Sequence, residues 1–368
     1  MENKVLEQNN EKRNSSIELL RIISMIMIIA HHYAVHGNYA MSKISLGLIS
    51  IQIFGMFGQV ANYIFVFITG YFLVKSKPNF KKILYLILEM EFYSIICYIA
   101  MVLVGEFPFN VNLLIQSLIP ILYGNWFIKT YIVLYLFIPF INKMIDRLDQ
   151  KEFKKLLLLM LLIFVVIPTI AISMPYEVGN LLIFIFAYMV GAYIALYPNK
   201  YTEDIQFNIK GSLIFITLLV LSVIVIDIIG ILMKSTYLLN KSMHFGNKYS
   251  IFTFLLAMFV FLVFKNIKFT SNLINNIATS TLGIYLIHDN IFIRNWLWNV
   301  CFPNSNYLNS NYIYVHFFVK VMMIYIVCLI IDKIRMIFEK AFQKDIDNLY
   351  NSIINFITKY LERKNIKL

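Results

Sequence analysis

The sequence consists of long apolar runs separated by short polar connections. Most runs are close to the ~20 residues that an α-helix needs to cross the hydrocarbon core of a bilayer. No run alternates polar and apolar residues as a transmembrane β-strand does. We therefore expect an all-α, polytopic bundle of about ten transmembrane helices. The predicted spans cover residues 17–36, 50–74, 82–104, 125–143, 155–173, 179–197, 211–232, 249–266, 277–294 and 312–334.

The ends of the chain are more polar than the part between them. We divide it into a cytoplasmic N-terminal segment (1–16), a transmembrane domain (17–334) and a cytoplasmic tail (335–368). The first apolar run contains histidines and no small-residue cleavage site follows it, so it is predicted to remain as a span. Apolar residues recur at helical intervals along the tail, which predicts an amphipathic helix on the membrane surface.

Composition and charge agree with this class of protein. Hydrophobic residues make up 60% of the chain and charged residues 14%, against about 25% charged residues in soluble domains. The net charge of +12 is explained by basic cytoplasmic loops rather than by nucleic-acid binding. If the N-terminus is inside, the inner connections carry most of the Lys and Arg residues. We therefore predict a multi-pass protein of the cell membrane with both termini in the cytoplasm.

Ionisable residues stand at both ends of the first apolar run. Arg21 lies near its inner end and His32 is eleven residues further along. At about 100° per residue, eleven residues complete three turns plus about 20°, so both side chains share one face of the helix. With a rise of ~1.5 Å per residue they are about 16 Å apart along the axis. Glu18, one turn before Arg21, can pair with it.

Each of these residues has a structural and a functional interpretation. Arg21 could be an anchor whose side chain reaches the lipid headgroups. His32 could be a structural histidine that bonds a neighbouring helix. However, ionisable groups inside spans are costly and usually mark functional sites, and histidine suits general-base catalysis at neutral pH. Two such groups on one stripe, at different depths, favour a pathway through the protein.

Other spans also carry polar residues near the predicted outer side. His288 and Asp289 lie in span 277–294, Asn125 and Trp126 begin span 125–143, and Asn62 lies in span 50–74. For Trp126 and for Tyr285 the alternative is a place in the interfacial aromatic belt. The chain has no G-x-S-x-G, Walker A, C-x-x-C or H-E-x-x-H motif. The histidines are spread out without metal-ligand spacing, so we expect no metal.

Five segments, in this order along the chain, resemble the integral-membrane acyltransferase family 3, whose members O-acylate cell-envelope carbohydrates. The segments are SIELLRIISMIMIIAHHY, IFVFITGYFL, NWFIKTYIVLYLFIPF, LLIFIFAYMVGAYIA and STLGIYLIH. Their characteristic positions are Arg21 and His32; Thr69, Gly70 and Tyr71; Trp126, Phe127 and Pro139; Gly191; and Ile284, Tyr285, Leu286 and His288.

The resemblance implies roles for individual residues. Arg21 matches the family's arginine and His32 its essential histidine, while Tyr285 and His288 belong to the signature near the end. Many members also carry an arginine-x-x-arginine motif after the second span. Here Lys81 and Lys82 supply positive charge in that region, but a tyrosine, Tyr85, stands near the place of the second arginine. Lysine lacks the bidentate fork of arginine.

The resemblance further implies the substrates. The donor is expected to be acetyl-CoA, with its phosphates held by Arg21, Lys81 and Lys82, and the acceptor a hydroxyl of a carbohydrate or lipid-linked glycan outside. His32 would act as general base or transient acyl carrier. Glu18, Asn62 and Trp126 would support the site, together with Tyr285 and His288. Some members carry an additional esterase-like domain. For this bacterial-type chain, a separate envelope-biosynthesis protein could take the role of that domain.

Two alternatives remain open at this stage. A transporter or flippase of lipid-linked glycans also fits ten spans with buried charges. The arginine–histidine stripe on one helix, and the lack of matched broken helices in two halves, favour the enzyme. A family member that has lost catalysis and serves in assembly is the other alternative, because Tyr85 departs from the family pattern.

Overall fold

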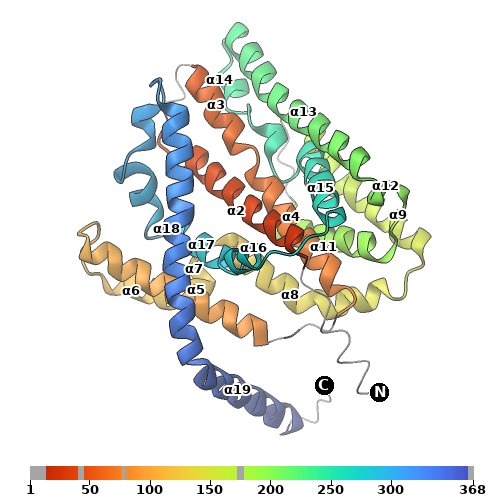
Figure 1. Cartoon of the computed structure of the whole chain (residues 1–368), viewed down its shortest axis with the longest axis vertical. Coiled ribbons are helices and arrows are strands. Elements are labelled where there is room, and N and C mark those ends of the chain that lie inside the picture. The colour runs from red at the N-terminus through yellow and green to blue at the C-terminus, as the bar shows by residue number, and fades with distance from the viewer. Residues whose placement is uncertain (1–13, 40–44, 77–78, 80, 172–177, 364–368) are drawn as a thin grey trace.

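A computed structural model describes residues 14–39, 45–76, 79, 81–171 and 178–363. All regular elements in these residues are helices, which confirms the all-α prediction (Figure 1). The first half contains α2 (Ser15–His36), α3 (Leu46–Gly55), α4 (Gly58–Leu73), α5 (Lys81–Leu103), α6 (Val111–Leu118), α7 (Pro120–Tyr123), α8 (Trp126–Ile145), α9 (Gln150–Leu161), a π-helical turn (Leu162–Val166), α10 (Ile167–Ile170) and α11 (Asn180–Leu196).

The second half contains two of the longest helices. It comprises α12 (Lys200–Glu203), α13 (Ile205–Leu232), α14 (Thr236–Leu239), a 3₁₀ turn (His244–Gly246), α15 (Ile251–Asn266), α16 (Asn272–Ala278), α17 (Thr281–His288), a π-helical turn (Trp296–Val300), a second 3₁₀ turn (Asn304–Tyr307), α18 (Ile313–Ala341) and α19 (Gln343–Arg363).

Eight helical segments among the described residues are long and apolar enough to cross a membrane. They are Ser15–His36, Leu46–Leu73, Lys81–Leu103, Trp126–Ile145, Gln150–Ile170, Ile205–Leu232, Thr236–Asn266 and Ile313–Ala341. The predicted span 179–197 corresponds to α11, which is apolar but has only 17 residues. The expected number of about ten spans is therefore not confirmed, although the membrane character is.

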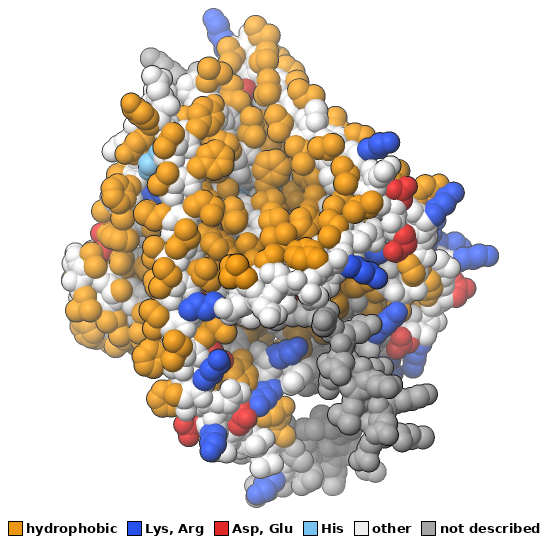
Figure 2. Space-filling model, in the orientation of Figure 1, with side chains coloured by type: hydrophobic (Ala, Val, Ile, Leu, Met, Phe, Trp, Pro, Cys, Tyr) orange, Lys and Arg blue, Asp and Glu red, His pale blue; other side chains and the backbone are white. Residues whose placement is uncertain are grey.

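The outward faces of α13 and α18 show where lipid would contact the protein. On α13 the side chains of Leu221, Val225 and Ile228 are 48–49% exposed. On α18 those of Ile326 and Ile330 are 48% and 55% exposed. Figure 2 shows hydrophobic side chains covering most of the visible face, with Lys and Arg gathered along its lower part and one edge. Such a continuous apolar surface is far larger than soluble monomers tolerate.

The predicted span 277–294 is wrong as a continuous helix. α16 ends at Ala278, a bend follows, and α17 has only eight residues. At ~1.5 Å per residue α17 is about 12 Å long, too short to cross a bilayer. The helix ends at His288, and in the turn that follows the side chain of Asn290 accepts a hydrogen bond from the backbone N–H of Phe292 at 3.1 Å. α17 is apolar because it is enclosed by protein rather than by lipid.

The start of α2 and the later part of α18 lie at the same end of the bundle. Ser15 Oγ donates to Asn275 Oδ1 at 2.8 Å, and Lys333 Nζ donates to the neighbouring Asn276 Oδ1 at 3.0 Å. α16 therefore joins the beginning of the first span to the last one. This agrees with two ends on one side of the membrane; that this side is the cytoplasm stays a prediction.

Two glycines allow α4 and α11 to touch through their backbones. A Cβ on Gly70 would lie 2.0 Å from the carbonyl oxygen of Tyr188, and a Cβ on Gly191 would lie 2.3 Å from that of Phe67. Small residues at helix crossings are a usual means of close packing in membranes. Gly70 thus packs against the backbone of α11, and Gly191 packs against the backbone of α4. A single contact between these two helices explains both glycines.

The predicted tail helix is present, with a shifted boundary. α18 continues as far as Ala341, and α19 begins at Gln343. Figure 1 shows α19 as a separate helix that leaves the lower end of α18 at an angle. The first turns of α19 contact the beginning of α5 through polar side chains, described below.

Candidate active site

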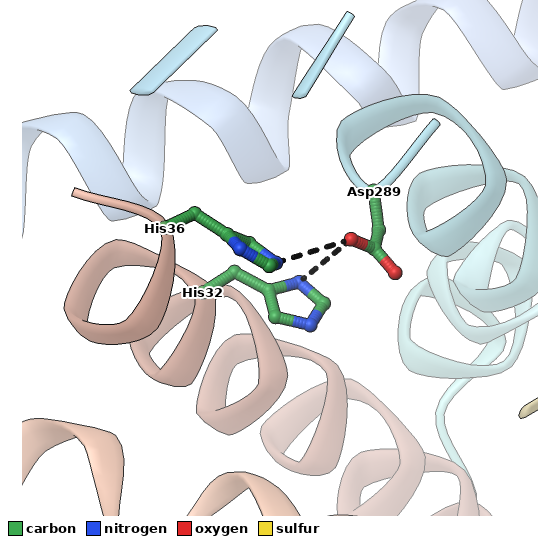
Figure 3. A group of neighbouring side chains, drawn as sticks. All are labelled: His32, His36 and Asp289. Carbon is green, nitrogen blue, oxygen red and sulfur yellow. Dashed lines mark ion pairs between the residues drawn. The ribbon is translucent and has the colours of Figure 1, made fainter. Parts of the chain in front are cut away.

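Three ionisable side chains from two helices meet inside the bundle. His32 lies in the last turns of α2, His288 is the last residue of α17, and Asp289 follows it directly. They are buried, with exposed fractions of 9%, 0% and 4% respectively. Figure 3 shows His32 and a fourth residue, His36, both on α2, facing the carboxylate of Asp289. The break after α17 is what brings this carboxylate to α2.

Hydrogen bonds assign the proton positions of the two central histidines. Nδ1 of His288 is 2.6 Å from the backbone oxygen of Ile284. A carbonyl oxygen only accepts, so Nδ1 of His288 carries a proton and Nε2 of its neutral ring is an acceptor. Nδ1 of His32 is 3.0 Å from that Nε2, so it donates to it. The other nitrogen of neutral His32, Nε2, therefore keeps its lone pair and is the basic atom of the cluster.

Asp289 is held by a neighbouring helix. Asn125, directly before α8, donates through Nδ2 to the Asp289 carboxylate at 2.8 Å and to its backbone oxygen at 3.0 Å. The other carboxylate oxygen, Oδ1, is 3.4 Å from His36 Nε2, 3.5 Å from Arg294 Nη1 and 3.9 Å from His32 Nδ1. A carboxylate thus lies beside the ring of His32.

A cavity of about 280 Å³ follows the face of α2 that carries Arg21 and His32. On α2 it is lined by Arg21, Met25 and Ile28. His32 continues this stripe one turn beyond Ile28. The other walls are Phe65, Thr69, Leu86, Phe127, Ile128, Tyr131, Ala278, Thr279, Thr281, Leu282 and Tyr285.

The two ends of the cavity differ in chemistry. At one end the side chain of Arg21 is 34% exposed, and its nearest carboxylate oxygen, on Glu18, is 4.0 Å away. Nε of Arg21 is buried and has no hydrogen-bond partner among the described residues. Leaving such a donor unpaired costs about 1–3 kcal/mol, so this end suits a ligand with acceptor oxygens. At the other end the ring of Tyr285 is 6.4 Å from that of His32.

The model of the family described as "Acyltransferase domain", acyltransferase family 3, matches residues 14–333. The chain belongs to acyltransferase family 3. It is therefore a membrane protein of an acyltransferase family, as the sequence resemblance predicts. No significant match was found among curated proteins or among solved structures.

The Ile-Tyr-Leu-x-His segment of this acyltransferase has a physical explanation. The backbone oxygen of Ile284 fixes the proton of His288, and the ring of Tyr285 closes one end of the cavity. Leu286 and Ile284 are 2% and 0% exposed and belong to the core between α2, α17 and α18. The segment thus positions one catalytic candidate, lines the cavity and anchors its own helix.

The two lysines expected to hold the donor differ in their surroundings. Lys81 forms an ion pair with Asp347 of α19 at 2.7 Å. Lys82 is exposed and lies one turn before Leu86, a residue that lines the cavity. Only Lys82 therefore extends the cavity face of α5 without an ion-pair partner in the described part of the chain.

Two further predicted residues lie outside the histidine cluster. Asn62 Nδ2 donates to Gln59 Oε1 at 3.0 Å. Trp126 has the ammonium of Lys248 5.2 Å from its ring centroid. Both line a separate cavity of about 10 Å³, which has room for about one water molecule. The structure therefore gives them no contact with His32.

The sequence interpretation missed three residues of the cluster as site residues: Asp289, His36 and Asn125. A signal for His36 was present, since it is four residues after His32 and shares its helix face. Asp289 and Asn125 were seen only as polar residues near the outer ends of their spans. Their meeting joins segments 164 residues apart and has no local sequence signal.

His32, His36 and Asp289 also have the composition of a metal site. One ligand atom from each lies within 4.8 Å of the others, and imidazole with carboxylate suits zinc or iron. For His32 that atom is Nδ1, which donates its proton to His288 in the arrangement above. A metal would have to replace this proton and break the bond, so the donor set does not fit a metal while the histidine pair is intact.

Proposed function

We propose that this acyltransferase moves an acetyl or other short acyl group from cytoplasmic acyl-CoA to a hydroxyl group of a cell-surface or lipid-linked carbohydrate. The observation that carries the proposal is the single stripe on α2. It runs from Arg21 along a cavity wall that ends, on α2, at Ile28, and His32, one turn further on the same face, has a free nitrogen that is a base. The donor would enter from the arginine end and the acceptor would reach His32 from the other side of the membrane.

The cavity supports this assignment through its size and its charge. At about 280 Å³ it is near the lower limit of small-molecule pockets, so it suits the narrow pantetheine arm rather than the whole of acyl-CoA. The unpaired Nε of Arg21 would donate to a phosphate at the entrance in a charge-assisted hydrogen bond. Lys82 would add a second positive charge.

His32 would act on the acceptor hydroxyl. Its Nε2 removes the hydroxyl proton while the oxygen attacks the carbonyl carbon of the thioester. The carbon–sulfur bond then breaks, and the proton passes from Nε2 to the departing thiolate, so no net proton is consumed. General-base catalysis of this kind contributes typically 10²–10⁴-fold. A route through acyl-His32 would use the same nitrogen as nucleophile.

The neighbouring residues would support the proton transfer. His288 holds the ring of His32 through Nδ1, and Asp289 lies 3.9 Å from the same atom. As Nε2 takes up a proton, positive charge develops on the ring and the carboxylate stabilises it. Tyr285, which borders both the cavity and the His32 ring, is the candidate donor to the developing oxyanion.

The test uses purified protein in liposomes with acetyl-labelled acetyl-CoA and extracted envelope glycans. Transfer of label to a glycan by the wild type, and at least 100-fold less by His32→Ala, would support the proposal. His244→Ala is the matched control, because His244 bonds the backbone oxygen of Thr169 at 3.1 Å and is not part of the cluster. Equal transfer by wild type and His32→Ala would refute it. Glycan translocation without acyl transfer would establish the transporter alternative.

A further inference from the structure

The C-terminal helix places an acidic side chain on the first turns of α5. Asp347 Oδ1 is 2.7 Å from Lys81 Nζ and accepts a hydrogen bond from the Tyr85 hydroxyl at 3.1 Å. Gln343, also on α19, donates to the same hydroxyl at 3.2 Å. One carboxylate oxygen of α19 is thus bound by two donors of α5. Tyr85, the departure from the family pattern, is one of the two.

These two donors are sequence neighbours of residues on the cavity face of α5, about 100° around the helix from it. Lys81 directly precedes Lys82, and Lys82 is one turn before Leu86, which lines the cavity. An ammonium and a hydroxyl that together bind a carboxylate oxygen also suit a phosphate oxygen, since both ligands are anionic acceptors. The pKa of the Asp347 carboxyl is held below its usual range by the hydrogen bond from Lys81, so the carboxylate is charged at neutral pH.

The contact between α19 and the bundle is shallow. The side chains of Lys81 and Asp347 remain 31% and 40% exposed. Behind them a cavity of about 390 Å³ separates α5, α18 and α19, lined by Tyr85, Phe338, Phe342 and Ile346 among others. α19 is therefore held to α5 mainly by polar groups, and an exposed ion pair is a weak restraint. A competing anion can displace it.

Resting on the function proposed above, we propose that Lys81 and Tyr85 form a binding site for a phosphate of acyl-CoA, and that Asp347 occupies this site in the donor-free protein. α19 is thus an internal competitor of the donor. Tyr85 stands near the place of the second arginine of the family motif. Its hydroxyl can donate a hydrogen bond to the carboxylate of Asp347 or to a phosphate of the donor. Release of α19 raises the affinity for the donor without changing the chemical step.

The test compares the full-length variant Asp347→Asn with the wild type in liposomes. We expect KM for acetyl-CoA to fall about two- to five-fold, the range set by an exposed ion pair, with kcat unchanged. Asp345→Asn is the matched control, because it removes the same charge from an exposed position two residues away on α19. Lys81→Gln should raise KM, and the Asp347→Asn change should add nothing to it.

Acetylpantetheine, which carries the same thioester and no phosphate, is the second probe. Its KM should be the same for wild type and Asp347→Asn. An unchanged KM for acetyl-CoA in Asp347→Asn, an equal fall in Asp345→Asn, or an equal fall with acetylpantetheine would each overturn the inference.

A direct measurement of acetyl-CoA binding distinguishes failure of the phosphate-site inference from failure of the proposed function. If the wild type binds acetyl-CoA and Asp347→Asn binds it equally, only the phosphate site is refuted. If neither protein binds acetyl-CoA, the donor assignment itself has failed and the competition falls with it. Carbodiimide coupling of Lys81 to Asp347, read by mass spectrometry, checks independently that α19 docks on α5.

Discussion

Replacing His288 tests the proton assignment on which the candidate mechanism depends. In His288→Ala the Nδ1–H of His32 loses its acceptor, which lies 3.0 Å away. The site of His288 is 0% exposed, so water does not replace it readily. His32 then either keeps an unpaired buried N–H or moves its proton to Nε2, the nitrogen that must act as base. Both results slow the reaction without removing His32.

The size of the effect follows from the lost hydrogen bond. An unpaired buried donor costs about 1–3 kcal/mol, which corresponds to a decrease in kcat of about 5- to 150-fold if it falls on the transition state. This is smaller than the loss expected for His32→Ala, since the base itself remains. His288→Gln supplies an amide oxygen as acceptor and should partly restore kcat.

The assay is acetyl transfer by equal amounts of folded protein, with the thermal unfolding temperature of each variant measured in the same detergent. Wild type, His288→Ala, His288→Gln and the His244→Ala control are compared at saturating donor. If His288→Ala retains kcat within two-fold of the wild type, the assignment of the basic nitrogen is refuted. If His288→Gln is as slow as His288→Ala, the acceptor role of His288 is wrong even though the residue matters.

Three further predictions concern the cavity, the helix packing and the metal question. Arg21→Gln should raise KM for acetyl-CoA by about ten-fold, the value of one charge-assisted hydrogen bond; steady-state kinetics with an unchanged KM would identify Arg21 as only an anchor. Gly191→Ala should lower the free energy of unfolding by about 1–3 kcal/mol, measured by denaturation against Gly179→Ala, whose added Cβ would meet nothing within 4 Å. Activity should be unchanged after exhaustive chelation, and a loss that zinc restores would show that His36 and Asp289 hold a metal.

Much of the helical architecture could be predicted because lipid contact and helix geometry act locally. Nine of the ten predicted spans fall on apolar helical segments, but 50–74 is divided into α3 and α4, and 155–173 into α9, a π-helical turn and α10. The Arg21–His32 stripe needed only the angle per residue. The failure at 277–294 has a physical cause: burial by protein and burial by lipid select the same apolar residues, so hydropathy does not distinguish α17 from a span.

The candidate site could be predicted only in part. His32 was named from the stripe on its helix and His288 from the family resemblance, but the bond between them joins residues 256 apart. The roles of Asp289 and Asn125 depend on where α17 ends and how α8 begins, which are tertiary facts. Asn62 and Trp126 were grouped with the site because of their predicted depth, yet depth does not say which face of a neighbouring helix they meet.

The short length of α17 has a consequence for how the protein responds to its membrane. Spans adjust to a thicker or thinner bilayer by tilting or by sliding relative to the headgroups. α17 is too short to cross the bilayer, and it packs against α2, α5 and α18. The depth of His288 is therefore set by protein neighbours and not by lipid chain length. His32 lies on a full-length span, so the geometry of the histidine pair in membranes of different thickness depends on how firmly α2 packs against α17.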